Sequence, residues 1–334
     1  MWLKNNSRGI GVSLAVALVA YMLGNSIPLI GGAVFGILIG MLIGTIFPLP
    51  SSFASGMNFT SKKILQWAVI ILGSGLSLRQ VYATGTASVI IILTTITAAL
   101  VAALLIGRLL KVDFNLKSLI GVGTAICGGS AIAAIAPIIE AEDQEIAYSI
   151  STVFLFNVVA VFIFPAIGHA LGLSQLGFGL FAGTAINDTS SVVAAGYSYG
   201  NEAGDYATIV KLTRTIMIVP IALGFVALMV MRKKQHAQHG QAGTFQFAKI
   251  FPWFILGFLF MSAVNTSGIL NAHIIALLKE LGKFLIVMAL SAIGLKTDMK
   301  KMASAGYKPI LLGLIIWVSV AAASILIQLY AGQW

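Results

Sequence analysis

Charged residues are scarce in this sequence: only 9% of its 334 residues are Asp, Glu, Lys or Arg, whereas 59% are hydrophobic. A soluble domain of this size needs more charge than that, and long apolar stretches are typical of integral membrane proteins. The net charge of +10 therefore indicates cytoplasmic loops, where Lys and Arg collect, rather than a surface for nucleic acid. We expect membrane lipid among the partners of this chain, and no nucleic acid.

Cysteine and catalytic motifs are almost absent as well. Cys127 is the single cysteine, which excludes an intramolecular disulfide. The sequence contains no GxSxG, HExxH or P-loop motif. We therefore predict a protein that is not an enzyme and uses no cofactor or metal. Any transport would be secondary, driven by an ion gradient or by the membrane potential.

Apolar runs of about 20 residues, the length that crosses the hydrocarbon layer, recur along the whole chain. The eleven runs lie near residues 9–25, 28–47, 64–79, 86–107, 117–139, 146–168, 175–200, 206–231, 250–266, 279–295 and 309–330. We therefore predict an all-α integral membrane protein with about eleven transmembrane helices in a single transport domain, residues 1–334. Segment 232–249 is polar and contains glycine, which predicts a cytoplasmic surface loop.

The distribution of charge predicts the orientation. With the N-terminus in the cytoplasm and alternating spans, 15 of the 20 basic residues fall in inside segments. The outside loops then carry acidic residues, at 140–143 and 202–205. This predicts a bacterial inner-membrane protein whose C-terminus lies outside.

A weak internal similarity suggests an inverted repeat. Gly75-Leu76, at the end of the third run, aligns with Gly294-Leu295, at the end of the tenth. In the predicted topology these two runs cross in opposite directions, as in transporters built from inverted-topology repeats. The halves would be about 28–168 and 175–330.

Two of the apolar runs contain residues that disfavour helix. Each break follows the tetrapeptide Gly-Thr-Ala-Ile, at residues 123–126 and 183–186. Glycine costs roughly 1 kcal/mol in a helix interior, and Asn, Asp and Ser compete for backbone hydrogen bonds. We predict two interrupted transmembrane helices that line a wet cavity, because unwound backbone at membrane depth is otherwise not tolerated. The sequence leaves open whether one of these segments is instead a re-entrant hairpin, which would change the count of spans. The candidate substrate-binding residues at these breaks are Cys127, Gly128, Gly129, Ser130, Asn187, Thr189, Ser190 and Ser191.

Lys211 and Arg214 are two cations inside a predicted span, three residues apart and so on one helix face. Each ionisable group costs on the order of 2.5–3.5 kcal/mol at the bilayer centre. The pair predicts an anion site, since arginine presents a planar fork of donors to oxyanions. The alternative is that both side chains reach up to the outer interface, helped by Asp205.

Asp188 is the acidic residue that lies well inside a span. It could pair with a cation, carry a coupling H⁺, help to hold Na⁺, or cap the second half-helix. The break at 127–130 could bind an anion through free N–H groups or pack closely against other helices. Cys127 itself fits a small apolar filler better than a nucleophile, and Asn157 fits an interhelical hydrogen bond better than a ligand.

Four motifs in this order resemble the bacterial YeiH-type family, whose name records proposed sulfate export. They are GTAICGGSAIAAIAPII, GTAINDTSSVVAAG, VKLTRT and IGLKTDMKKM, and the resemblance covers nearly the whole chain. It implies a multispan inner-membrane protein. The arrangement is also similar, at the level of fold only, to sodium/proton antiporters and bile-acid symporters.

Three functions remain open from sequence. The first is a secondary transporter that exports a small anion, sulfate or an organic sulfonate, past Lys211 and Arg214. The second is a cation/proton antiporter of the same fold class with Asp188 as carrier. The third is a membrane protein that transports nothing, a sensor or an assembly partner. A homodimer would be ordinary for this architecture.

Overall fold

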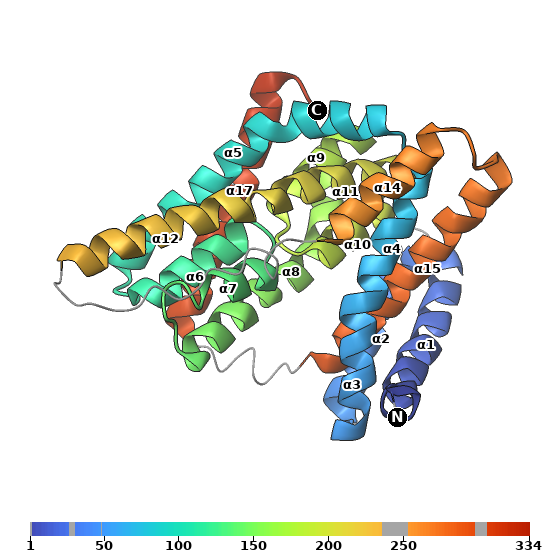
Figure 1. Ribbon diagram of the computed structural model, residues 1–334, viewed down its shortest axis with the longest axis horizontal. Coiled ribbons are helices and arrows are strands. Elements are labelled where there is room, and N and C mark those ends of the chain that lie inside the picture. The colour runs from blue at the N-terminus through green and yellow to red at the C-terminus, as the bar shows by residue number, and fades with distance from the viewer. Residues whose placement is uncertain (1, 27–30, 48, 236–252, 298–305) are drawn as a thin grey trace.

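The computed structural model describes residues 2–26, 31–47, 49–235, 253–297 and 306–334. Every regular element within these ranges is helical (Figure 1). The α-helices are α1 Trp2–Ser26, α2 Gly31–Ile46, α3 Ser51–Phe59, α4 Leu65–Leu72, α5 Leu78–Leu109, α6 Phe114–Ala125, α7 Gly129–Ile135, α8 Asp143–Ala170, α9 Gln175–Ala185, α10 Thr189–Tyr199, α11 Asn201–Ile216, α12 Ile218–Gln235, α14 Phe254–Thr266, α15 Ala272–Lys296 and α17 Tyr307–Ala331. A π-helical turn, Thr60–Ile64, joins α3 to α4, and a 3-10 turn, Gly73–Gly75, follows α4.

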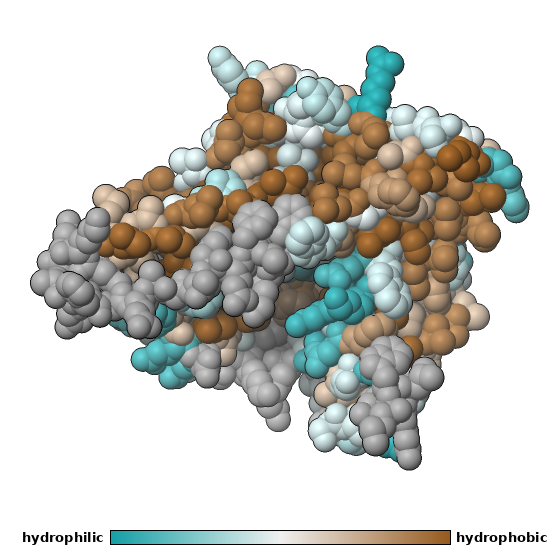
Figure 2. Space-filling view, in the orientation of Figure 1, coloured by the Kyte–Doolittle hydropathy of each residue, from teal (hydrophilic) through white to brown (hydrophobic). Residues whose placement is uncertain are grey.

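The helices have the length and composition of a multi-pass membrane protein. Within the described ranges, five segments are long and apolar enough to cross a membrane: Asn6–Ser26, Leu78–Leu109, Gln144–Ala170, Asn201–Met231 and Tyr307–Ala331. Figure 2 shows hydrophobic side chains over much of the visible face. Each of the eleven apolar runs overlaps a helix or a pair of helices, but length and composition alone qualify fewer than eleven as spans. Most of the predicted loop 232–249 lies outside the described residues.

Two helix bundles lie side by side (Figure 1). Helices α1 to α4, α14 and α15 pack mainly against one another and form what we call the panel bundle. Helices α5 to α9 and α17 pack together with α10 and α11, and we call this group, with α12, the hairpin bundle. The two bundles meet through apolar side chains of α8 and α10 that face α2, α4 and α15. Figure 2 shows a hollow between the bundles on this face, bordered on one side by hydrophilic side chains.

Small residues bring α2 and α15 close together inside the panel bundle. Gly36, Gly40 and Gly44 recur every four residues and therefore share one face of α2. A methyl group at Gly40 would lie 2.6 Å from the Ser291 carbonyl oxygen and 3.0 Å from the Cα of Gly294. Small residues at such crossings let two membrane helices approach closely. The panel bundle is therefore held by close backbone contact.

The first predicted interrupted helix is broken where the sequence indicates, but its two arms fold back on each other. Helix α6 ends at Ala125 and α7 begins at Gly129. A methyl group on Gly123 would lie 2.9 Å from the Ile132 side chain, whereas nine residues of continuous helix span about 13 Å. The Asn115 amide, near the start of α6, donates to Glu145 Oε2, near the start of α8, over 3.1 Å. The chain therefore returns to the end from which it came, and we call α6–α7 hairpin 1.

The second predicted interrupted helix also doubles back. The Phe178 and Tyr199 rings, on α9 and α10, stack with centroids 3.9 Å apart. The Gln175 side-chain oxygen, at the start of α9, accepts hydrogen bonds from the backbone N–H groups of Glu202 and Ala203, just beyond the end of α10. Both ends of this segment therefore lie together, and we call α9–α10 hairpin 2.

The two hairpins open at opposite ends of the hairpin bundle. Hairpin 1 opens beside Glu145, near the start of α8. Hairpin 2 opens beside the end of α8, where His169 stacks on Tyr199 with centroids 4.2 Å apart. The 28 residues of α8 separate these ends by about 42 Å at 1.5 Å per residue.

The doubling back corrects the predicted placement of the loops. A crossing helix would have put the acidic segment 140–143 at the opposite end from Lys117, whereas hairpin 1 puts both at one end. The charge pattern predicts that the acidic segment is an outside loop. If Lys117 lies inside, this prediction is wrong, because the segment lies at the same end as Lys117. Acidic residues contribute little to orientation in membranes, so the basic residues still favour one side.

Candidate functional site

The tips of the two hairpins meet about halfway along α8. Asn157 lies 14 residues after the start of α8 and 13 before its end. Its side-chain oxygen accepts hydrogen bonds from the backbone N–H groups of Asn187 (3.0 Å) and Asp188 (3.2 Å), at the tip of hairpin 2. A methyl group at Gly128, at the tip of hairpin 1, would lie 3.7 Å from the Asn157 amide nitrogen and 3.8 Å from the Cβ of Asp188. Asn157, predicted to form an interhelical hydrogen bond, therefore holds the tip of hairpin 2 and lies beside the tip of hairpin 1.

Each tip is shaped by the residues that the sequence pattern singled out. Gly128 has φ +65° and ψ −128°, a conformation that is essentially restricted to glycine. It lets the Gly128 N–H reach back to the Gly123 carbonyl oxygen, 2.8 Å away, to close the turn. At the other tip Asp188 is the N-cap of α10, and its carboxylate accepts from the Ser191 N–H (3.2 Å) and the Ser190 hydroxyl. The predicted capping role of Asp188 is therefore confirmed.

Lys211 and Arg214 are the basic residues at the tips, and both side chains are fully buried. The predicted alternative, that they reach up to the outer interface, is wrong. Lys211 Nζ donates to the carbonyl oxygens of Ile126 (2.6 Å) and Ile186 (3.1 Å), one from each tip. Arg214 extends this link to the end of α6. Its Nε donates to Ala125 O over 2.7 Å, its Nη2 to Thr124 O over 2.7 Å and its Nη1 to Ile186 O over 3.3 Å.

These two cations therefore bind carbonyl groups that a helix end leaves without partners. The last carbonyls of α6 and α9 point along the negative end of each helix dipole, where a cation is favourable. Together Lys211 and Arg214 connect both tips to α11. Five of the eight N–H donors of the two side chains (three on Lys, five on Arg) make these bonds. Sequence reasoning found the cations but missed these carbonyl partners, because backbone groups leave no signature in side-chain identity.

Asn187 stands out because its side chain is fully buried and neither of its amide atoms has a hydrogen-bond partner within the described part of the chain. A buried amide without a partner costs on the order of 1–3 kcal/mol, so native proteins rarely leave one in place. An amide offers donors and an acceptor at once. The Asn187 side chain is therefore suited to binding a polar ligand at the tips.

The remaining predicted residues differ in how they meet solvent. Gly129 and Ser130, at the start of α7, are exposed, and Thr189 is partly exposed. Ser190 and Ser191 are buried, next to the Asp188 carboxylate.

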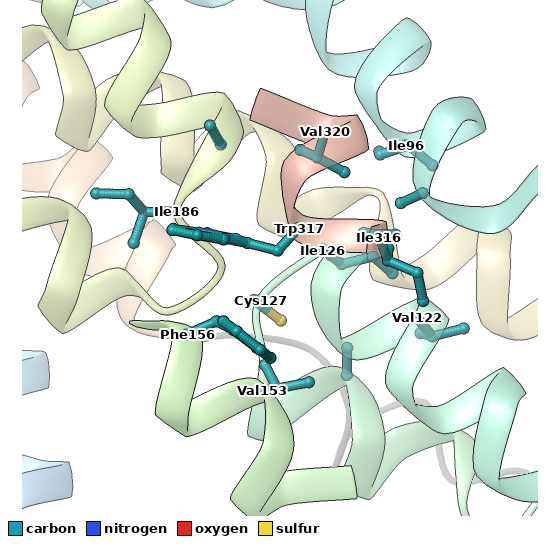
Figure 3. Close-up of a cluster of buried hydrophobic side chains, with 14 of the residues drawn as sticks. Ile96, Val122, Ile126, Cys127, Val153, Phe156, Ile186, Ile316, Trp317 and Val320 are labelled. Carbon is teal, nitrogen blue, oxygen red and sulfur yellow. The ribbon is translucent and has the colours of Figure 1, made fainter. Parts of the chain in front are cut away.

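Cys127 lies in a different environment from the rest of the predicted set. Figure 3 shows it among apolar side chains that include Phe156 and Trp317. Its side chain is 4% exposed, which agrees with the predicted role of a small filler. Within the described ranges, no group of three or more His, Cys, Asp and Glu side chains is placed to hold a metal ion.

Comparison with known proteins identifies the family. The family described as conserved hypothetical protein 698 matches residues 8–313. A UPF0324 membrane protein of Clostridium tetani is 45% identical to this chain over 343 residues, covering 100% of this chain and 99% of its own length. The chain belongs to the UPF0324 membrane protein family. Membership confirms the resemblance to the YeiH-type family that the four motifs indicated.

Further UPF0324 relatives cover the chain just as fully. One from Streptococcus pyogenes serotype M6 is 46% identical over 98% of this chain and 97% of its own length. One from Fusobacterium nucleatum is 43% identical over 99% of each chain. No solved structure matches this chain. The relatives' shared name, together with the apolar helices, identifies a multi-pass membrane protein.

Proposed function

We propose that this UPF0324 protein is a secondary transporter that moves a small anion, sulfate or an organic sulfonate, through a site at the two hairpin tips. The observation that carries the proposal is the meeting of two opposed hairpins at buried cations, halfway along a helix long enough to span a membrane. Non-helical backbone at membrane depth is tolerated where it lines a cavity, and transporters place substrate sites near the midplane at such breaks. The tips are then re-entrant segments of the bacterial inner membrane.

The opposed hairpins supply the geometry that transport requires. Each hairpin enters the membrane from a different side and ends at the shared site. Each can therefore act as a thin barrier between the site and the side from which it enters. Because the two hairpins open at opposite ends of the hairpin bundle, they have the opposed directions that inverted repeats require. An inverted repeat is therefore part of the proposal, centred on the hairpins rather than on the end-to-end alignment of Gly75 with Gly294.

Charge at the tips favours an anion. Lys211 and Arg214 carry two positive charges and Asp188 one negative charge, so the site has a net positive charge before substrate binds. In this proposal the two cations supply field, and the hydrogen bonds to substrate come from Asn187 and from the tip residues at 128–130 and 189–191. An inside-negative potential then drives efflux with about 2.3 kcal/mol per charge per 100 mV.

A cation/proton antiporter remains the second candidate, because Asp188 is a carboxylate at the same place. The Asp188 carboxylate accepts hydrogen bonds from Ser190 and Ser191. These bonds favour a structural role as the N-cap of α10 over a role as a proton carrier. The variant Asp188→Asn keeps a side chain that can cap a helix but carries no proton. Anion transport should survive this change, whereas an antiporter should lose exchange completely.

The test is flux into proteoliposomes that contain the purified protein. Labelled sulfate and a labelled organic sulfonate should each be assayed with an imposed membrane potential, and Na⁺/H⁺ exchange with an imposed pH gradient. Lys211→Ala and Arg214→Ala should lower anion flux at least tenfold. Lys283→Ala is the matched control. Lys283 lies on α15, away from the tips, and forms an ion pair with Glu280 at an N–O distance of 2.9 Å. Normal flux in both site variants would reject the site.

A further inference from the structure

The end of α6 and the end of α9 present four carbonyl oxygens to the same small volume. They belong to Thr124, Ala125, Ile126 and Ile186, and each accepts a hydrogen bond from Lys211 or Arg214. The donor–acceptor distances run from 2.6 to 3.3 Å, and neither cationic side chain has exposed surface. A cluster of carbonyl oxygens at converging helix ends is a cation site, because the helix dipoles add negative potential there.

In transporters with broken helices, unwound carbonyls and half-helix C-terminal ends usually coordinate the coupling Na⁺ or H⁺. Here the positions are taken by side chains of the chain itself. The ammonium group of Lys211 spans the two tips, as a shared ion would. The guanidinium group of Arg214 donates to three carbonyl oxygens, those of Thr124 and Ala125 at the end of α6 and that of Ile186 at the end of α9.

We propose that Lys211 and Arg214 are built-in counter-ions that replace a coupling sodium ion, and that transport through the hairpin tips runs without sodium. The statement about sodium-independent transport rests on the proposed function. The structural statement, that side chains fill a cation site, does not depend on it. Lys211 and Arg214 are positioning residues in this account. They hold both tips to α11 and set the charge that the substrate meets.

The first measurement uses the wild-type protein in detergent. Its thermal unfolding midpoint is recorded in NaCl and in N-methylglucamine chloride at equal ionic strength. Because no carbonyl site is open, the two midpoints should agree within about 1 °C, whereas a ligand that binds only the folded state would raise the midpoint. A saturable rise that is specific to sodium would overturn the proposal.

The second measurement opens the site. Lys211→Ala removes the propylammonium group beyond Cβ. Ile126 O then loses its donor, and Ile186 O keeps only the 3.3 Å hydrogen bond from Arg214. Propylammonium, the missing fragment, should bind there and raise the unfolding midpoint of this variant in a saturable way, by about 2 °C or more at saturation. Lys283→Ala should show no such rise. If propylammonium, ethylammonium and ammonium all leave Lys211→Ala unchanged, the carbonyls are not a cation site and the proposal fails.

Arg214→Ala with ethylguanidinium provides the same test if Lys211→Ala does not fold. The final measurement is anion flux of the wild-type protein with sodium and with N-methylglucamine on both sides. The two rates should agree within twofold, and a loss of tenfold or more without sodium would refute sodium independence. Absence of any flux would count against the proposed function alone, since the midpoint measurements need no substrate.

Discussion

The turn at the tip of hairpin 1 depends on a backbone conformation that can be tested by adding one methyl group. Gly128 has φ +65° and ψ −128°, which residues with a Cβ adopt only at a cost of order 1–3 kcal/mol. A methyl group there would meet Asn157, Asp188 and Val153 at 3.7–3.8 Å, which is ordinary contact. The cost of Gly128→Ala is therefore backbone strain and not a clash.

Gly129→Ala is the matched control, one residue along the chain. This glycine begins α7 and has no positive φ, and a methyl group added to it would have no neighbouring atom within 4 Å. Alanine is favoured over glycine inside a helix by up to about 1 kcal/mol, so this variant should be as stable as wild type or slightly more stable. The two neighbouring variants should then differ by about 1–4 kcal/mol in free energy of unfolding.

The assay is reversible unfolding of the purified protein in mixed micelles, with increasing SDS fraction and helicity followed by circular dichroism. Gly128→Ala should unfold at a lower SDS fraction than wild type, and Gly129→Ala should not. Anion flux should fall in Gly128→Ala, because a distorted turn displaces the carbonyl of Ile126 from Lys211. Equal stability of the two variants would refute the claim that the tip requires a glycine with positive φ at position 128.

Two further changes test the connections of the hairpins. Asn157→Leu removes the acceptor of the Asn187 and Asp188 backbone N–H groups. Because each unpaired buried donor costs about 1–3 kcal/mol, this variant should be less stable than wild type by about 2 kcal/mol or more in the same SDS assay. A loss below about 0.5 kcal/mol would contradict a structural role for these two hydrogen bonds. Asp205→Asn breaks the 2.9 Å ion pair with Lys279 that joins the two bundles; because both side chains are partly exposed, stability should change by less than about 1 kcal/mol, and a loss of about 2 kcal/mol or more, twice that limit, would contradict the assignment of a weak, partly solvated ion pair.

The local features of the site could be predicted from sequence because they depend on neighbouring residues. Gly128 marks a turn that only glycine adopts, and Asp188 caps a helix that starts at the next residue; both are properties of a few consecutive positions. The shared helix face of Lys211 and Arg214 also follows from their spacing alone. Composition was equally decisive for the class of protein, since so little charge is incompatible with a soluble domain of this length.

The path of the chain through the breaks was decided by the tertiary structure. An interrupted crossing helix and a re-entrant hairpin have the same hydropathy and nearly the same length, because two arms of 11 residues contain as many residues as one span. What separates the two is contact between distant positions, such as Gln175 with Glu202. The partners of Lys211 and Arg214 were equally hidden. A backbone carbonyl is present at every residue, and only the folded chain determines which four of them converge on the two buried cations.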